Sequence, residues 1–211
     1  MVLFLHAAPV SLAATQAALE RTRATLALRH ALAPHLVDPR AMYFAHDEFA
    51  YARIAAALGG HLRGDETRVV LSCSVYNGFA ARLEAEFGIP VERSDDAGAC
   101  AALECGTPIG LAASYPPSYA VIESHLRALA RAARHDVEVV PLLSENAFSF
   151  ADDARRYARA LVESVGTAGG LATVFLAQYS MDPVASSVAE ATSVPVVSAL
   201  DATLTRLGAM Q

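Results

Sequence analysis

Short runs of apolar residues alternate with longer stretches of helical periodicity along nearly all of the 211-residue chain. Such alternation predicts repeated strand–helix units, and strands without polar residues on either face belong to a sheet that is covered on both sides. Glycines mark several of the joins, as at Gly59-Gly60 and Gly88. The predicted fold class is therefore α/β, with short parallel β-sheets flanked by helices. The expected strands are residues 2–5, 36–37, 69–72, 90–92, 108–112, 137–140, 173–177 and 195–197, and the expected helices are residues 12–32, 47–58, 76–87, 95–103, 118–134, 150–165, 181–191 and 200–207.

The sequence also matches itself when it is shifted by 105 residues, about half its length. Residues 69–73 (Val-Val-Leu-Ser-Cys) then lie over residues 174–178 (Val-Phe-Leu-Ala-Gln), and a Val/Ile-Pro-Val strand start matches further on without a gap. Any two strand–helix units look alike in an alanine-rich chain, but a gapless match through a strand, a helix and the next strand favours a duplication. We expect two pseudo-symmetric lobes with the active site in the cleft between them: residues 1–94, residues 95–197, and a C-terminal helix at 198–211 that packs back on the first lobe.

Cys73 is the first candidate for a reactive group. It ends an apolar strand and precedes a predicted helix, and open α/β sheets bind ligands beyond the carboxyl ends of their strands. A helix N-terminus lowers the pKa of a nearby thiol, and its free amides can hold an anion such as a carboxylate. Burial as a small apolar residue is the alternative. The binding residues expected after this strand are Ser74, Val75, Tyr76 and Asn77.

The matching turn of the second half contains Gln178, Tyr179 and Ser180. Gln178 cannot exchange a proton near neutral pH, but it can hydrogen-bond a substrate, and Ser180 offers a hydroxyl. Tyr179 could act as a weak acid or pack in the core. Asp182, which is followed by a proline, is predicted to cap the next helix.

Other candidates follow other predicted strands. Ser114 and Tyr115 come after the strand at 108–112, where their hydroxyls could hold a carboxylate or a developing enediolate. His6 follows the first strand, and it is either a base or hydrogen-bond donor at the cleft or a histidine of the core. Arg40 could bind a carboxylate or be a solvated loop residue.

Composition excludes several classes of function. All 16 basic residues are arginine, so no lysine can form a Schiff base with pyridoxal phosphate or hold a nucleotide phosphate in a P-loop. A net charge of −6 argues against nucleic-acid binding, and the seven histidines show no metal-ligand spacing. No apolar run is long enough for a membrane span. The three cysteines show no disulfide pattern, which favours a cytoplasmic protein, and the mean hydropathy of +0.33 is consistent with a homo-oligomer.

Three stretches resemble the aspartate/glutamate racemase superfamily, which includes hydantoin racemase, maleate isomerase and arylmalonate decarboxylase. They are residues 69–77 around Cys73, residues 106–114 (Gly-Thr-Pro-Ile-Gly-Leu-Ala-Ala-Ser), and residues 174–178 with the later 194–196 (Val-Pro-Val). The resemblance implies two pseudo-symmetric lobes and an enzyme without a cofactor. It also implies that a cysteine from each lobe faces one side of a carbon next to a carboxylate.

The chain departs from this family pattern at the second cysteine. Cys73 matches the first cysteine, but Gln178 stands at the place of the second. The turn after the first strand is His-Ala-Ala-Pro at residues 6–9, without the Asp-Ser of the racemases. The single cysteine, together with Ser114-Tyr115, looks more like arylmalonate decarboxylase, although the lone cysteine of that enzyme lies in the second lobe.

The expected function is that of a cofactor-independent enzyme acting on a small carboxylate at the carbon next to the carboxyl group. It would be racemase- or isomerase-like, with Cys73 as acid–base group or nucleophile. Racemisation needs a second acid or base, which would be Tyr179 or His6, whereas decarboxylation needs one proton donor and cis–trans isomerisation needs a nucleophilic thiolate. The alternatives are a one-cysteine decarboxylase and a protein that binds a small carboxylate without turnover.

Overall fold

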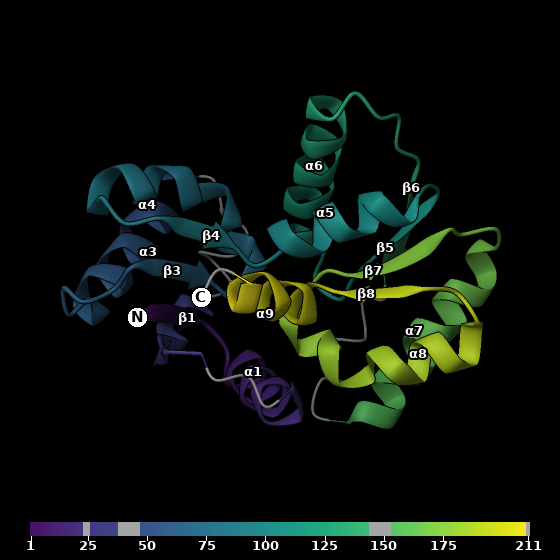
Figure 1. Cartoon of the computed structure of the whole chain (residues 1–211), viewed down its shortest axis with the longest axis horizontal. Coiled ribbons are helices and arrows are strands. Elements are labelled where there is room, and N and C mark those ends of the chain that lie inside the picture. Colours follow the sequence, from purple (N-terminus) through teal and green to yellow (C-terminus); the bar gives the residue numbers. More distant parts are fainter. Residues whose placement is uncertain (23–25, 38–46, 144–152, 210–211) are drawn as a thin grey trace.

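The computed structural model describes residues 1–22, 26–37, 47–143 and 153–209. Its described strands form two parallel four-stranded sheets of the same order, β2-β1-β3-β4 and β6-β5-β7-β8 (Figure 1). Helices flank both sheets, which confirms the predicted α/β class. The first sheet consists of β1 (Val2–His6), β2 (Leu28–Leu32), β3 (Arg68–Leu71) and β4 (Val91–Arg93), and the second of β5 (Ile109–Ala113), β6 (Val139–Leu143), β7 (Thr173–Leu176) and β8 (Val196–Ser198).

Helices connect the strands, and most begin within a few residues of their predicted start. None of the helices in the described part of the chain is long and apolar enough to cross a membrane. The α-helices are α1 (Pro9–Thr22), α3 (Glu48–His61), α4 (Ala80–Phe87), α5 (Asp96–Cys105), α6 (Pro116–Ala132), α7 (Ala154–Ala168), α8 (Ala185–Thr192) and α9 (Ala199–Ala209), and the 3-10 helices are η1 (Pro34–Leu36), η2 (Ser74–Phe79) and η4 (Tyr179–Val184).

The internal repeat is visible in the structure. β3, η2, α4 and β4 each begin and end 105 residues before β7, η4, α8 and β8. Both helices of the repeat also end in a left-handed residue, Gly88 with φ 67° and Ser193 with φ 56°. A strand, a 3-10 helix, an α-helix and the next strand therefore match without an insertion, as the sequence shift predicts.

The predicted helix at 12–32 is wrong in its second half. Helix α1 ends at Thr22, and Leu28–Leu32 form β2, which pairs with β1 over its whole length. Leucine, alanine and arginine favour a helix, but pairing with a neighbouring strand overrides that local preference. Because β2 lies at the sheet edge, Arg29 and His30 remain partly exposed. The strand therefore lacks the apolar run that identifies the others.

Two further segments differ from their predictions. Residues 36–37 are not a strand, because Leu36 ends the 3-10 helix η1. The predicted helix at 150–165 corresponds to α7, which begins at Ala154 after Asp153, whose carboxylate accepts hydrogen bonds from two amides of the first turn. Residues 150–152 lie outside the described part of the chain.

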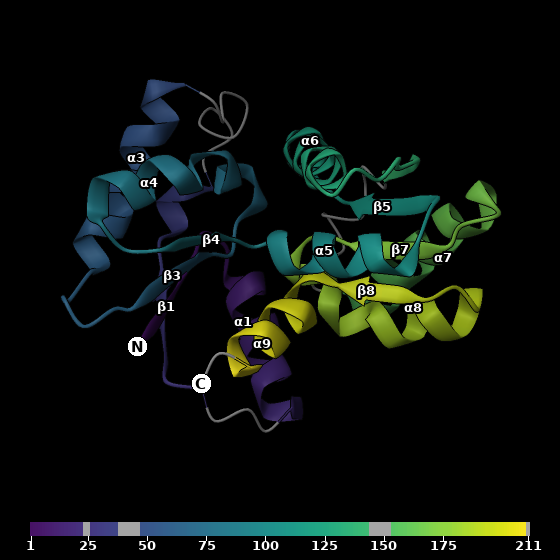
Figure 2. The same cartoon turned by 45° about the horizontal axis from the view of Figure 1, so that its top comes forward.

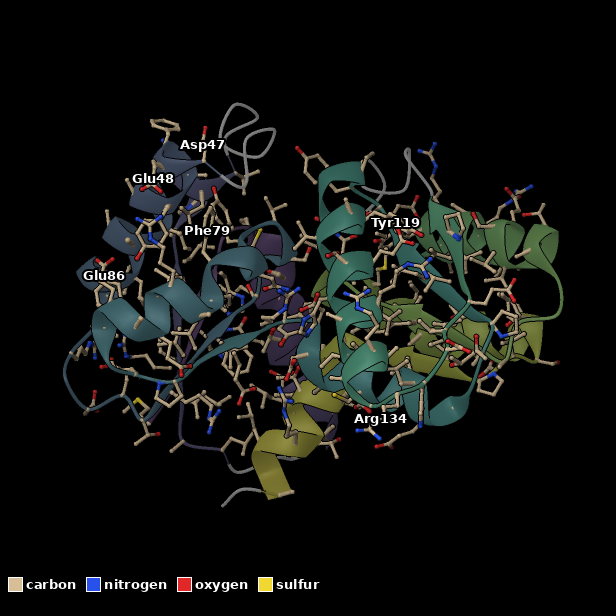
Figure 3. The ribbon with its side chains drawn as sticks, turned by 90° about the horizontal axis from the view of Figure 1, so that it is seen from above. Asp47, Glu48, Phe79, Glu86, Tyr119 and Arg134 are labelled. Carbon is tan, nitrogen blue, oxygen red and sulfur yellow. The ribbon has the colours of Figure 1, made fainter. Side chains whose placement is uncertain are left out.

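Each half sends a helix to the turn that follows the central strand of the other half. Helix α1 packs against η4, and α6 packs against η2. Seen from above, α6 stands beside the half that carries Phe79 at the end of η2; the labelled Tyr119 lies in its first turn and Arg134 just beyond its end (Figure 3). Helix α9 contacts both α5 and α1, between the two sheets (Figure 2). The lobe boundary after residue 94 and the packing of segment 198–211 on the first lobe remain predictions.

Gly98 lets α5 approach the second sheet closely. A Cβ atom at this position would lie 2.5 Å from Cε2 of Phe175 on β7 and 2.8 Å from Cα of Ala199, the first residue of α9. The second of these contacts is with backbone, which cannot rotate away. Glycine is unfavourable within a helix, so its presence here reflects the small distance between α5, β7 and α9.

We expect Gly98→Ala to destabilise the protein by about 1–3 kcal/mol, because the added methyl group overpacks this contact. Gly60→Ala on α3 is the matched control, since no atom lies within 4 Å of the Cβ that it would add. The better helix propensity of alanine should make that variant more stable by about 0.5–1 kcal/mol. Denaturant unfolding measures both changes, and a Gly98→Ala protein as stable as the wild type would contradict the close packing.

Candidate active site

A small pocket lies where β3 and β7 end and η2 and η4 begin. Helix α1 contributes Val10 and Ser11 to its wall, and the first turn of α6 contributes Ser118. Its open volume is about 50 Å³, which is more than one water molecule occupies. A larger groove of about 700 Å³ runs along α4 and β4, but it contains none of the predicted site residues. The small pocket brings together Cys73, Ser74, Val75, Tyr115, Gln178, Tyr179 and Ser180 from the sequence prediction.

Cys73 and Gln178 occupy equivalent positions in the two halves. Each is the extended residue directly before a 3-10 helix, with φ −104° and ψ 108° at Cys73 and φ −118° and ψ 138° at Gln178. Both side chains line the same pocket. The structure therefore brings together the two residues that the sequence repeat pairs.

Burial decides the protonation state of Cys73. Loss of hydration raises the pKa of its thiol to about 11, although the amides of Val75 and Tyr76 act in the opposite direction. The predicted lowering by these amides is therefore outweighed, and the expectation of a lowered pKa is wrong in its net direction. At neutral pH the thiol carries its proton and can donate it.

Gln178 is held as a hydrogen-bond donor toward the pocket. Its Oε1 accepts from the backbone amide of Ser114 at 2.7 Å and from Oγ of Ser114 at 2.8 Å. A backbone N–H can only donate, so the oxygen of the Gln178 amide must face Ser114 and the NH₂ group must face the other way. Ser114 thus orients Gln178 and does not itself line the pocket.

The two residues expected to exchange protons opposite Cys73 are engaged elsewhere. Tyr179 lines the pocket, but its hydroxyl donates to Oγ1 of Thr203 at 3.0 Å, and burial raises the pKa of this phenol above its usual value. His6 does not line the pocket; it is fully buried and hydrogen-bonded to His30 and Ser11. Burial and the neighbouring His30 lower the pKa of His6 to about 3. Tyr179 therefore shares the pocket with Cys73 but has its hydroxyl bound to Thr203, whereas His6 lies outside the pocket and fits the alternative of a core histidine.

Tyr76 and Asn77 support the turn from behind. Their side chains do not line the pocket. The hydroxyl of Tyr76 donates to the carbonyl of Leu36 at 2.7 Å, and Nδ2 of Asn77 donates to Ser94 at 2.9 Å and to Asp95 at 2.8 Å. The backbone amide of Tyr76 is also engaged, because it donates to the carbonyl of Cys73 at 3.0 Å. The structure therefore gives neither residue the expected binding role, and both side chains hold η2 in place.

The sequence predicts that Asp182 caps a helix, but in the structure it lies inside η4. Its carboxylate accepts from Oγ of Ser198 at 2.6 Å and from Arg21 at 3.0 Å. Asp182 comes 105 residues after Asn77. Both residues tie the 3-10 helix to the end of the next strand.

Two buried hydroxyls near the site were not singled out from the sequence. Ser118 lines the pocket and is 1% exposed, and its Oγ has no hydrogen-bond partner among the described residues. The hydroxyl of Tyr157 on α7 also lacks a hydrogen bond there, but Ser114 and Ser180 lie near enough to lower its pKa while burial raises it. Leaving such a group unpaired is unfavourable, so the hydroxyl of Ser118 is available for a hydrogen bond to whatever occupies the pocket. Ser118 belongs to the same run as Ser114 and Tyr115, whose hydroxyls are expected at the cleft, and this position is a signal for it; Tyr157 lies within a predicted helix and carries no such signal.

The described wall of the pocket carries no charged side chain. Among all residues that the structure describes, no group of three or more His, Cys, Asp or Glu is placed to hold a metal ion. The predicted lack of a metal or cofactor remains a prediction. Arg40 lies outside the residues that the structure describes.

No protein-family model matches this sequence, and none of the curated proteins is significantly similar to it. Solved structures are similar over nearly the whole chain. Allantoin racemase from Pseudomonas fluorescens has a TM-score of 0.68 at 16% identity and covers 99% of this chain and 89% of its own. Glutamate racemase from Campylobacter jejuni has a TM-score of 0.74 at 12% identity, with 100% and 86% covered. A mutant of arylmalonate decarboxylase with associated sulfate ion has a TM-score of 0.66 at 14% identity, with 99% and 94% covered. The chain thus has the two-lobe α/β fold of these racemases.

The raised pKa predicts how Cys73 reacts with iodoacetamide, because only the thiolate attacks this reagent. The rate should rise about tenfold for each pH unit and level off only near pH 11. Peptide mass spectrometry separates Cys73 from the exposed Cys100 and Cys105. A rate at Cys73 that levels off at about pH 8 would show that the amides outweigh burial.

Proposed function

We propose that this chain is a cofactor-independent enzyme of the aspartate/glutamate racemase superfamily, and that it moves a proton at a carbon next to a carboxylate. Cys73 is its acid–base group. The observation that carries the proposal is the meeting of Cys73 and Gln178, from equivalent ends of two repeated units, at one pocket. Racemases of allantoin, glutamate and aspartate and a decarboxylase share the fold, which supports chemistry of this kind.

The substrate in this proposal is a small carboxylate bound by neutral donors. The NH₂ group of Gln178, the hydroxyl of Ser118 and the backbone amide of Val75 are the groups offered to it. Preorganised donors of this kind stabilise the charge that develops on an enediolate by roughly 2.7–4 kcal/mol each. No charged side chain lines the described wall, so the described residues meet the negative charge of the substrate with dipoles.

Proton transfer occurs on one face of the substrate carbon. Cys73 supplies a neutral thiol, whereas Gln178, at the equivalent position, cannot exchange a proton near neutral pH. The hydroxyl of Tyr179 and the ring of His6 are bound elsewhere. A reaction that needs one proton donor fits this arrangement better than one that needs two.

Decarboxylation of a malonate-type acid is such a reaction. The bond between the α-carbon and one carboxylate breaks, carbon dioxide leaves, and the electron pair remains as an enediolate on the second carboxylate. The thiol of Cys73 then protonates the α-carbon. Ala8, Val10 and Val37 give the pocket an apolar part, which is unfavourable for the carboxylate that leaves and suits the uncharged product.

A racemase or related isomerase is the second candidate, favoured by the number of racemases among the structures with this fold. It would need an acid or base in addition to Cys73. A nucleophilic cis–trans isomerase is less well supported, because a thiol with a pKa of about 11 contributes little thiolate at neutral pH. Binding of a small carboxylate without turnover is the outcome that would replace all three reactions.

The role of Cys73 is tested with α-amino, α-hydroxy and malonate-type acids in D₂O, followed by NMR. We expect Cys73→Ser to lower turnover by about 100- to 10,000-fold, the usual contribution of general acid–base catalysis. Cys100→Ser is the matched control, because Cys100 is exposed on α5 and outside the pocket. Release of carbon dioxide identifies a decarboxylase and scrambling of configuration identifies a racemase, whereas undiminished turnover in Cys73→Ser would refute the mechanism.

The one-sided reaction is tested at Gln178. In the wild type we expect deuterium from D₂O to enter one face of the α-carbon, giving a single enantiomer of the product. Gln178→Cys places a second thiol at the equivalent position, so the product should become a mixture of enantiomers. Gln178→Ser is the control for loss of the amide, and it should retain a single configuration. A racemic product from the wild type would show that another group already serves the second face.

A further inference from the structure

Two histidines that the proposed mechanism does not use form a hydrogen-bonded pair behind the pocket. Nε2 of His6 on β1 lies 3.0 Å from Nδ1 of His30 on the edge strand β2. His6 is fully buried, whereas His30 is partly exposed. The ring centroid of Phe4 lies 6.0 Å from that of His6 and 5.9 Å from that of His30, so packing holds both imidazoles in place. The pair joins the outer edge of the first sheet to its interior.

The hydrogen bonds continue from His6 to the wall of the pocket. Nδ1 of His6 lies 3.4 Å from Oγ of Ser11, and Oγ of Ser11 lies 3.3 Å from Oγ of Ser72. Both serines line the pocket, as does Cys73, the residue after Ser72. Four side chains therefore form a continuous path from a partly exposed strand edge to the pocket.

The proposed reaction requires such a path. Protonation of a substrate by Cys73 leaves a thiolate, which must regain a proton from solvent before the next turnover. The titratable groups on the described wall of the pocket are one thiol and the two phenols of Tyr115 and Tyr179, whose usual pKa values lie above neutral pH. A substrate would also fill the small pocket and keep water away from the sulfur. The proton must then come from outside the pocket.

We propose that His30, His6, Ser11 and Ser72 form a proton relay that returns a proton from solvent to Cys73. This relay rests on the proposed function of Cys73 as a proton donor. A proton binds Nε2 of His30 while the proton on its Nδ1 passes to Nε2 of His6, and the proton on Nδ1 of His6 passes to Ser11. The proton of Ser11 passes to Ser72, which releases its own into the pocket. Each group gains one proton and loses one, so no charge remains in the core and both rings end in the opposite tautomer.

Both histidines are in the state that a relay needs. A neutral imidazole has one N–H group and one acceptor nitrogen, so it can take up a proton on one side and release one on the other. Burial lowers the pKa of His30, and it lowers that of His6 to about 3, so both rings are neutral at pH 7. The hydroxyls of Ser11 and Ser72 can each donate and accept, and when no proton moves they donate to the carbonyls of Ala8 and Leu5.

The relay can be tested with acetate at saturating concentration in the pocket, so that water is kept from the sulfur, through the exchange of the Cys73 thiol from S–H to S–D after transfer to D₂O. The infrared S–H stretching band reports this exchange, and Cys100→Ser with Cys105→Ser leaves Cys73 as the only thiol. His30→Gln keeps an amide that can hydrogen-bond His6 but cannot pass a proton on. His61→Gln is the matched control, because His61 is a partly exposed histidine outside the path.

We expect His30→Gln to slow the exchange about tenfold or more, imidazole in solution to restore part of the rate, and His61→Gln to behave as the wild type. An unchanged rate in His30→Gln overturns the relay. If His30→Gln does not fold, His30→Leu serves in the same comparison, because leucine suits an edge strand. Turnover keeps the two proposals apart. If Cys73→Ser leaves turnover unchanged, the proposed function is refuted whatever the exchange experiment shows. If Cys73→Ser loses turnover but His30→Gln exchanges at the wild-type rate, the relay alone is refuted.

Discussion

The parallel hydrogen-bond ladders of the two central strands determine where the chemistry of this protein can lie. β3 pairs with β1 and β7 with β5, and in each case the ladder extends one residue beyond the strand. The amide of Ser72 donates to the carbonyl of Leu5 at 3.0 Å, and the amide of Ala177 donates to that of Ala112 at 3.2 Å. The next residues are Cys73 and Gln178, so the last hydrogen bond of each ladder fixes one of them at the carboxyl end of its sheet. The 3-10 helices then turn the chain away and leave these two side chains at the pocket.

Burial leaves the groups around this pocket uncharged. It raises the pKa values of Cys73 and Tyr179, which become charged when they lose a proton. It lowers the pKa of His6, which becomes charged when it gains one. The sign differs, but the cause and the result are the same, because removing a group from water disfavours its charged form. An anionic substrate would bring the charge to this pocket. Oriented dipoles act strongly on such a charge, since little water is present to screen them.

The sequence predicts the two repeated α/β halves of this structure better than the orientations of the side chains at the pocket. The repeat at 105 residues identifies both halves and pairs Cys73 with Gln178, because gapless matches in strands and their joins translate directly into equal backbone positions. Strand β2 escapes prediction because its stability comes from pairing with β1, which no local pattern reveals. The directions of side chains escape it for the same reason. The hydroxyl of Tyr179 turns to Thr203 and that of Ser118 to the pocket, and these orientations depend on neighbours more than 20 residues away or on another element.

The two halves keep the same frame but use it differently. Asn77 and Asp182 hold equivalent 3-10 helices to equivalent strands, so the backbone before each helix has nearly the same conformation whether it carries Cys73 or Gln178. The difference between the two side chains therefore changes the chemistry of the pocket without changing the fold. At Gln178 the extra polar atom is not left unpaired, because Ser114 satisfies the oxygen with two hydrogen bonds. The same bonds prevent the amide from rotating, and a group that cannot exchange a proton becomes a donor of known direction. A pseudo-symmetric frame thus supports an asymmetric pocket, with a protonated thiol from one half and an oriented amide from the other.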